Sequence, residues 1–228
     1  MPLKIFQYLF LLFSVSLMFS FKNIENEENS TLILFNSLET DSQKPKFEVF
    51  EKGMIGYSKL KGMGLLGGKN LLTIIDFSLS SNKKRMWVID LKKKKILHHL
   101  LVSHGRNTGN EFATNFSNVL QSKKSSLGFY VTGKTYYGKH GLSLYLDGME
   151  EGINDNARER SIVMHGAKYV NKNFIKKYGR LGRSYGCPAI SMSKHKEVIN
   201  LLKNKSCLFI YYPEAKYFKN SKLIKNNE

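Results

Sequence analysis

The sequence predicts a mainly β domain with peripheral helices, an α+β fold. Seven apolar segments of four to ten residues, rich in β-branched and aromatic side chains, are separated by polar or glycine-containing turns, which is the pattern of β-strands. Only three segments carry apolar residues at the three- and four-residue spacing of a helix. With 228 residues, of which 42% are hydrophobic and 12% aromatic, the chain can form one domain with a real core, so wholesale disorder is excluded.

The first 21 residues have the composition of an export signal. Lys4 is the only charged residue, and an apolar run from Ile5 to Phe21 follows it, which is the arrangement of a secretory signal peptide. The alternative is an uncleaved N-terminal anchor, because about 17–20 apolar residues can just span a bilayer. Residues 1–21 therefore predict an exported protein, with membrane anchoring as one of the two routes.

Residues 22–43 are polar and rich in Asn and Glu, with one lysine and five acidic residues, and we interpret them as an acidic polar linker. The whole chain has a formal charge of +18, so residues 44–228 are more basic than the chain as a whole. Such a charge fits nucleic acid, an anionic membrane surface or an acidic polymer as a partner. Export and the lack of any zinc-finger, helix-turn-helix or RRM pattern argue against nucleic acid.

The expected folded domain spans residues 44–213 and opens with a helix. Apolar residues recur at helical spacing after Pro45, and the pattern ends at Gly62, Gly64, Gly67 and Gly68. The predicted strands are 71–77, 85–91, 96–103, 127–136, 142–146, 161–164 and 207–212. Two further helices are predicted at 171–178 and 193–204, and residues 214–228 are interpreted as a basic tail.

Cys187 is the candidate nucleophile. The glycine before it allows a substrate backbone to approach and offers an unhindered amide, and Arg180 and Arg183 would favour the thiolate. His165, at the end of a predicted strand twenty-two residues upstream, can meet the thiol in space as its base. From these residues alone a catalytic Cys–His pair and a structural thiol both stay open. Cys207 begins an apolar strand and is expected to be an unpaired core residue.

The segments SIVMHG (161–166) and GRLGRSYGCP (179–188) resemble the YkuD-type L,D-transpeptidase catalytic domain, in its murein L,D-transpeptidase branch. The family signature is an upstream His followed by Ser/Thr-His-Gly-Cys, and the chain matches it at His165, Ser184, Gly186 and Cys187. Segments 75–78, 87–91, 125–130 and 138–141 look like the same branch. The resemblance covers about residues 45–213 and implies a YkuD-like β-sandwich.

This resemblance implies acyl transfer on peptidoglycan stem peptides without cofactor or metal. Cys187 would attack the carbonyl between meso-diaminopimelate and D-alanine, and His165 would carry the proton. Ser184 would shape the loop, and the amide of Cys187, with that of Gly186 or Tyr185, would form the oxyanion hole. An amine acceptor would give a 3-3 cross-link and water a trimmed stem. The implied location is the bacterial cell envelope, in the periplasm.

Two positions depart from the family pattern. Tyr185 replaces the usual His before the glycine, and Ala189 stands where many relatives carry Arg or Asn. Arg180 and Arg183 are the candidates for the missing cation and for substrate binding. Tyr185, and His140 in the segment GKHG, are expected to line the substrate site.

Other histidines give weaker signals. Ser103-His104-Gly105 copies part of the motif, but Arg106 occupies the place of the nucleophile, so a structural or substrate-lining role is expected. His98 and His99 alternate faces on a predicted strand and cannot both reach one metal. His195 begins a predicted helix and is expected at the surface.

The alternatives to a transpeptidase are a thiol hydrolase of the same fold, acting on wall peptides as a carboxypeptidase or endopeptidase, and a non-catalytic cationic wall-binding protein.

Overall fold

The structure is a computed structural model that describes residues 29–225. The described residues belong to two units, which divide between Leu38 and Glu39. Residues 29–36, within the predicted linker, are helical. The predicted export segment 1–21 lies outside the described residues. Between residues 29 and 225, no helix is both long enough and apolar enough to cross a membrane.

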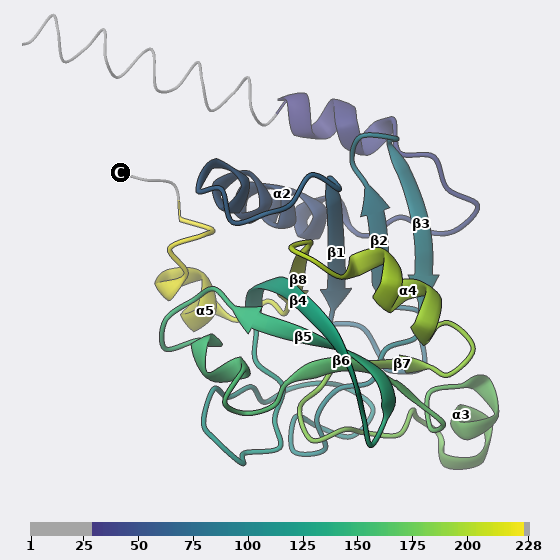
Figure 1. Ribbon diagram of the computed structural model, residues 1–228. Coiled ribbons are helices and arrows are strands. Elements are labelled where there is room, and N and C mark those ends of the chain that lie inside the picture. Colours follow the sequence, from purple (N-terminus) through teal and green to yellow (C-terminus); the bar gives the residue numbers. More distant parts are fainter. Residues whose placement is uncertain (1–28, 226–228) are drawn as a thin grey trace, which may run out of the picture. The chain divides into compact units, whose positions relative to one another are not determined.

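Eight strands form one sheet in the order β3-β2-β1-β8-β4-β5-β6-β7 (Figure 1). They are β1 (Leu71–Asp76), β2 (Met86–Asp90), β3 (Lys95–Leu100), β4 (Gly128–Gly138), β5 (Gly141–Gly148), β6 (Val163–Ala167), β7 (Ala189–Ser191) and β8 (Cys207–Tyr211). Every residue of β1, β2 and β8 is buried, as in strands covered on both faces. Only the β1–β8 and β6–β7 pairs are parallel.

The fold class predicted from the sequence, mainly β with peripheral helices, is confirmed. The strands of the expected sandwich are joined in one continuous sheet, because β8 pairs with β4 and links the β3-β2-β1-β8 half to the β4-β5-β6-β7 half. The helices are α2 (Phe47–Gly62), α3 (Lys172–Tyr178), α4 (His195–Leu202) and α5 (Ala215–Asn220), with a short 3-10 helix, η1 (Asp155–Ala157).

Local sequence explains where two predicted helices begin and end. Lys46, just after Pro45, precedes the first residue of α2, and the helix ends at the expected glycines. Asn171 caps α3 by accepting a hydrogen bond from the amide of Phe174, and Gly179 ends it with a left-handed φ of 71°.

Strand β7 and helix α5 are among the elements that were not predicted. Strand β7 has three residues, too few for any periodicity, and it forms because it pairs with β6. Helix α5 lies in the segment predicted as a basic tail. Its Tyr217 is 4% exposed and donates a hydrogen bond to the carboxyl of Glu150, so tertiary contact orders this part of the tail.

The Glu150 carboxyl makes the stability of the fold depend on pH. Burial raises its pKa above the usual 4.5, although bonds from Ser221, Phe129 and Tyr217 oppose this shift. The protonated form of Glu150 is thus favoured in the folded state. Its contribution to the free energy of unfolding is lost as the pH rises through the folded pKa. Relative to Glu150→Gln, the wild type should lose unfolding free energy as the pH rises above about 4.5, by about 1.4 kcal/mol per unit of pKa difference. Urea unfolding of both proteins measures this, and parallel pH curves would contradict it.

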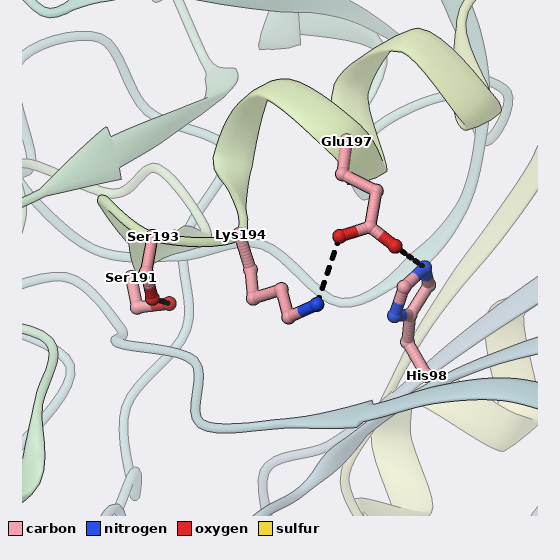
Figure 2. Close-up of polar contacts among 5 residues, drawn as sticks. All are labelled: His98, Ser191, Ser193, Lys194 and Glu197. Carbon is pink, nitrogen blue, oxygen red and sulfur yellow. Dashed lines mark hydrogen bonds and ion pairs between the residues drawn. The ribbon is translucent and has the colours of Figure 1, made fainter.

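A polar contact links helix α4 to β3 (Figure 2). Glu197 accepts from Lys194 Nζ at 2.9 Å and faces His98 Nε2 at 3.5 Å. His99, the next residue, instead stacks on Trp87 with ring centroids 4.6 Å apart. The two neighbouring histidines therefore have different partners, as strand alternation requires.

Candidate active site

The turn that carries Cys187 is held by the Ser184 side chain. The Ser184 hydroxyl accepts a hydrogen bond from the Gly186 amide at 3.1 Å and donates one to the Cys187 carbonyl at 2.6 Å. Gly186 has a φ of +124°, and a Cβ there would lie 2.7 Å from the Lys124 carbonyl oxygen. Only glycine fits this position, so the Ser-x-Gly-Cys spacing creates the shape of the turn.

The partial copy of the motif at 103–106 lies directly beside this turn. The Ser103 amide donates to the Ala189 carbonyl at 2.9 Å, and the Ser184 amide donates to the His104 carbonyl at 3.0 Å. The Arg106 amide returns a bond to the Ser184 carbonyl at 2.8 Å. The segment 103–106 is therefore a backing strand only in the sense of isolated bridges, and it supports the turn that carries Cys187.

His104 has a structural role in this backing strand. The ring is 1% exposed, and its Nδ1 lies 2.8 Å from Nη2 of the fully buried Arg85, which also donates to the Val102 carbonyl. Burial first, and then the Arg85 charge, lower the pKa of His104 to about 3. The neutral ring can accept from Arg85 through Nδ1 and donate to the Gly109 carbonyl through Nε2, 3.3 Å away.

His165 is buried and held in one orientation. The β6–β7 register sets it opposite Ala189, two residues beyond the cysteine. Its Nδ1 lies 3.0 Å from the Gly166 carbonyl oxygen. Nδ1 therefore carries the proton and donates it to this carbonyl, and Nε2 keeps its lone pair. The ring is 2% exposed and stacks on His140 with centroids 4.2 Å apart. Burial is the main cause that lowers the pKa of His165 to about 4.

His195, expected at the surface, is 3% exposed. A Cβ on Gly166 would lie 2.6 Å from its Cγ, so the His195 ring packs against the residue whose carbonyl orients His165. The surface prediction for His195 is wrong because this ring fills the space that the missing side chain leaves.

The surroundings of the Cys187 sulfur favour the thiol form. Sγ lies 3.6 Å from the Ser161 carbonyl oxygen, to which it donates, and 3.5 Å from the Val163 amide, from which it accepts. Burial is the largest influence and raises the pKa of the thiol, while the Val163 amide and the charges of Arg160 and Lys139 lower it. The resting thiolate expected from the sequence is therefore disfavoured, because desolvation outweighs the nearby cations.

The two arginines proposed from the sequence have other partners. Arg183 Nη1 donates to the Arg106 and Gly109 carbonyls and to Asn110 Oδ1, at 2.8–3.1 Å. Arg180 donates through Nη1 to the Leu181 carbonyl next to it at 2.8 Å. Arg183 thus ties two loops together while its charge remains at the site.

The two departures from the family pattern have different surroundings. Ala189 is fully buried and packs with Ala167, Val170 and Leu181, so a cation has no room there. Tyr185 is 62% exposed.

One cavity of about 750 Å³ brings most of the predicted site residues together. Those that line it are His140, His165, Arg180, Arg183, Ser184, Tyr185 and Cys187. Gly186 is buried behind them. Sequence reasoning missed several other lining residues, among them Lys139, Arg160, Ser161 and Tyr169, whereas Arg106 belongs to the segment 103–106, for which a structural or substrate-lining role is expected. For Arg160 the sequence offers one signal, the excess of basic residues between 158 and 187.

The oxyanion donors can be narrowed. The Gly186 amide donates its hydrogen bond to Ser184 Oγ. Of the two amides that the sequence left open beside that of Cys187, those of Gly186 and Tyr185, the Gly186 amide is therefore excluded. Within residues 29–225 the Tyr185 amide has no hydrogen-bond partner, and the Cys187 amide lies against its own sulfur. These two amides are the remaining candidates.

Ser184→Ala should lower kcat about 100-fold, because without these bonds the turn can shift the Cys187 sulfur. Displacement of a reacting group by about 1 Å has an effect of this size. The loss of both hydrogen bonds should also reduce the unfolding free energy by about 1–2 kcal/mol. Ser184→Thr, which keeps a hydroxyl, should recover most of kcat, with KM nearly constant in both variants. Steady-state kinetics and urea unfolding test this, with the exposed Ser193→Ala as control. An unchanged kcat in Ser184→Ala would contradict the positioning role.

Residues 41–211 match the family described as L,D-transpeptidase catalytic domain. Among solved structures, the chain is similar to an L,D-transpeptidase from Mycobacterium smegmatis, with 10% identity and a TM-score of 0.39 over 63% of this chain and 59% of that one. L,D-transpeptidase 1 from Mycobacterium tuberculosis gives 11% identity and a TM-score of 0.34 over 61% and 60% of the two chains. The L,D-transpeptidase from Stackebrandtia nassauensis is 13% identical, with a TM-score of 0.38 over 83% of this chain and 91% of that one.

The chain spans about three fifths of the length of the two mycobacterial proteins. No curated protein sequence matches it. The family match over residues 41–211 takes in most of the chain, including the sheet from β1 to β8 and the whole cavity described above. The chain therefore belongs to the L,D-transpeptidase catalytic domain family.

Proposed function

We propose that this protein is a peptidoglycan L,D-transpeptidase that uses Cys187 as its nucleophile and works through a thioester. The observation that carries the proposal is that Cys187 and His165 line one cavity in a member of this family. The same cavity is rich in cations: Arg106, Lys139, Arg160, Arg180 and Arg183. Cations at this density suit a peptide stem that carries carboxylates.

The first half of the reaction forms the acyl-enzyme. His165 Nε2 takes the thiol proton as Cys187 Sγ attacks the carbonyl between meso-diaminopimelate and D-alanine. The Tyr185 and Cys187 amides stabilise the oxyanion. The tetrahedral intermediate then expels D-alanine, whose amine receives the proton from His165, and a thioester remains on Cys187.

The second half transfers the acyl group. An amine of a second stem attacks the thioester and gives a 3-3 cross-link, or water attacks and leaves a trimmed tripeptide. Sγ leaves as the thiolate and takes a proton back through His165. A resting thiol beside a neutral histidine suits this sequence, since the proton moves only when the carbonyl is in place.

Incubation of the purified protein with disaccharide-tetrapeptides, followed by mass analysis, tests the proposal. Cross-linked dimers support transpeptidation. Tripeptides alone support the hydrolase of the same fold. Unchanged substrate would favour the non-catalytic wall-binding alternative.

We also propose export to the cell envelope, supported by the Lys4 n-region and the apolar run from Ile5 to Phe21. The N-terminal sequence of the protein recovered from cells distinguishes cleavage from anchoring. A cytoplasmic chain that still begins at Met1 would contradict export.

A further inference from the structure

Three backbone segments meet at the side chain of Ser125: the loop 117–126 that carries it, the segment 103–106 and the turn that carries Cys187. Ser125 is fully buried. Its hydroxyl donates a hydrogen bond to the Gly186 carbonyl at 2.9 Å and accepts one from the Gly105 amide at 3.1 Å. One hydroxyl therefore joins all three segments behind the nucleophile.

The segments approach one another too closely for side chains on the two glycines. A Cβ on Gly105 would lie 3.0 Å from the Gly186 Cα. A Cβ on Gly186 would lie 2.7 Å from the Lys124 carbonyl oxygen. The Ser125 hydroxyl is thus enclosed by backbone atoms on several sides, and its two hydrogen bonds have little freedom to change partners.

The position of Ser125 is itself fixed from two directions. Its amide donates to Thr108 Oγ1 at 2.7 Å. The Arg160 guanidinium donates to four groups of the same loop, the carbonyls of Ser117 and Lys124 and the hydroxyls of Ser122 and Ser126. The loop therefore presents the Ser125 hydroxyl to the nucleophile turn in one place.

The Gly186 carbonyl and the Cys187 amide belong to one peptide unit. This unit is trans, and because a trans peptide is planar its C=O and N–H point in opposite directions. Ser125 holds the carbonyl toward the loop, so the N–H points the other way, where it lies against the Cys187 sulfur. An oxyanion forms on the carbon that becomes bonded to this sulfur, so an amide facing Sγ is placed to stabilise it.

The other candidate donor, the Tyr185 amide, is held in a comparable way. The Ser184 carbonyl, which belongs to the same peptide unit, accepts a hydrogen bond from the Arg106 amide at 2.8 Å. That bond joins backbone to backbone, so no side-chain substitution removes it directly. At the Gly186–Cys187 unit the donor is instead a side chain, and one substitution can remove it.

We propose that Ser125 is a positioning residue of the active site, whose hydroxyl fixes the Gly186–Cys187 peptide unit so that the Cys187 N–H faces the developing oxyanion. The proposal rests on the part of the proposed function that makes Cys187 the nucleophile, and it deepens that function. Ser125 acts through the peptide unit and not on the sulfur. Its removal should therefore slow reactions of Cys187 that form an oxyanion and spare those that form none.

Two reagents separate these reactions. With p-nitrophenyl acetate, Sγ attacks the ester carbonyl and an oxyanion forms; the new C–S bond stays, and the bond to nitrophenolate breaks. With iodoacetamide, Sγ displaces iodide from a CH₂ group without any oxyanion. In both reactions the thiol gives up its proton to the solvent. Nitrophenolate absorbance and mass analysis give the two rates, and the rates in Cys187→Ala are subtracted as background.

We expect Ser125→Ala to lower the acylation rate about 10–100-fold. This is below the loss of about 10²–10³-fold that follows the outright removal of an oxyanion donor, because the Cys187 amide remains and only its orientation is released. The rate of alkylation by iodoacetamide should stay close to that of the wild type. The ratio of the two rates should therefore fall about as far as acylation does.

Thr132→Val is the matched control. The Thr132 hydroxyl is buried, with 1% of the residue exposed, and it also donates to a carbonyl, that of Leu202, and accepts from an amide, that of Ser206. Thr132 does not belong to the residues that line the Cys187 cavity. Its substitution removes an equivalent pair of hydrogen bonds and should leave the ratio of acylation to alkylation unchanged.

An unchanged ratio in Ser125→Ala overturns the proposal, whether both rates are retained or both fall equally. No Cys187-dependent acylation of the wild type overturns it too. Urea unfolding shows whether the variant folds. If Ser125→Ala does not fold, Thr108→Val, which removes the acceptor of the Ser125 amide, undergoes the same two reactions. A selective fall in acylation then supports the proposal, and an unchanged ratio overturns it.

Because neither reagent contains a peptidoglycan stem, the two proposals can fail separately. Selective loss of acylation in Ser125→Ala, with no turnover of disaccharide-tetrapeptides by the wild type, overturns the proposed function and supports the role of Ser125. Turnover of the stems, with an unchanged ratio in Ser125→Ala, leaves the proposed function standing and removes Ser125 from it.

Discussion

Cys187→Ala should abolish both cross-linking and trimming, with a loss of more than about 10⁴-fold, as in other enzymes deprived of their nucleophile. No thioester can form without Sγ. The fold should survive, because the turn is held by Ser184 and the segment 103–106, while the hydrogen bonds of Sγ with the Val163 amide and the Ser161 carbonyl, at 3.5 and 3.6 Å, are weak. The unfolding free energy should change by no more than about 1 kcal/mol. Product analysis and circular dichroism measure the two effects.

Cys207 provides the matched control. It is free and fully buried in β8, so Cys207→Ala should reduce stability by about 1–2 kcal/mol and leave product formation intact. The reverse pattern, with activity retained in Cys187→Ala and lost in Cys207→Ala, would remove Cys187 from the mechanism. Thiol titration of the unreduced protein should find both sulfhydryls free.

His165→Gln should reduce kcat by about 10²–10⁴-fold, the usual contribution of a positioned general base. Because burial lowers the pKa of His165 to about 4, the wild type should keep its base active down to weakly acidic pH. Below that, protonation removes the lone pair of Nε2, so activity should fall as the pH drops through about 4.

The pH profile tests this assignment directly. The limb near pH 4 should disappear in His165→Gln, while His99→Gln, which changes the ring stacked on Trp87, should retain it. A wild-type limb near the ordinary histidine pKa of about 6.5 would contradict a buried neutral base. It would favour a preformed thiolate–imidazolium pair instead.

Much of the fold follows from local sequence. The predicted strands at 71–77, 85–91 and 207–212 overlap β1, β2 and β8, since strands buried on both faces are continuous apolar runs. The helices α2 and α3 begin and end beside Pro45, Asn171 and glycines, whose conformational preferences act within a few residues. Strand β7 and helix α5 have no such signal, because contacts with distant residues stabilise them.

The candidate site divides in the same way. His165, Ser184, Gly186 and Cys187 are recognisable from their spacing, because Gly186 and Ser184 act on the cysteine within one turn. No motif spacing of this kind marks Arg160. It reaches the site because it bonds a loop more than thirty residues away in the chain.

The candidate residue types, a cysteine in a glycine turn and a histidine at a strand end, can be recognised from the sequence because those features are local. Their expected ionisation follows from the tertiary structure instead. From the sequence, Arg180 and Arg183 suggested a thiolate, but burial raises the pKa of Cys187 and lowers that of His165. Local charge can be counted along a chain, whereas desolvation depends on what packs around the group, and here it is the larger effect.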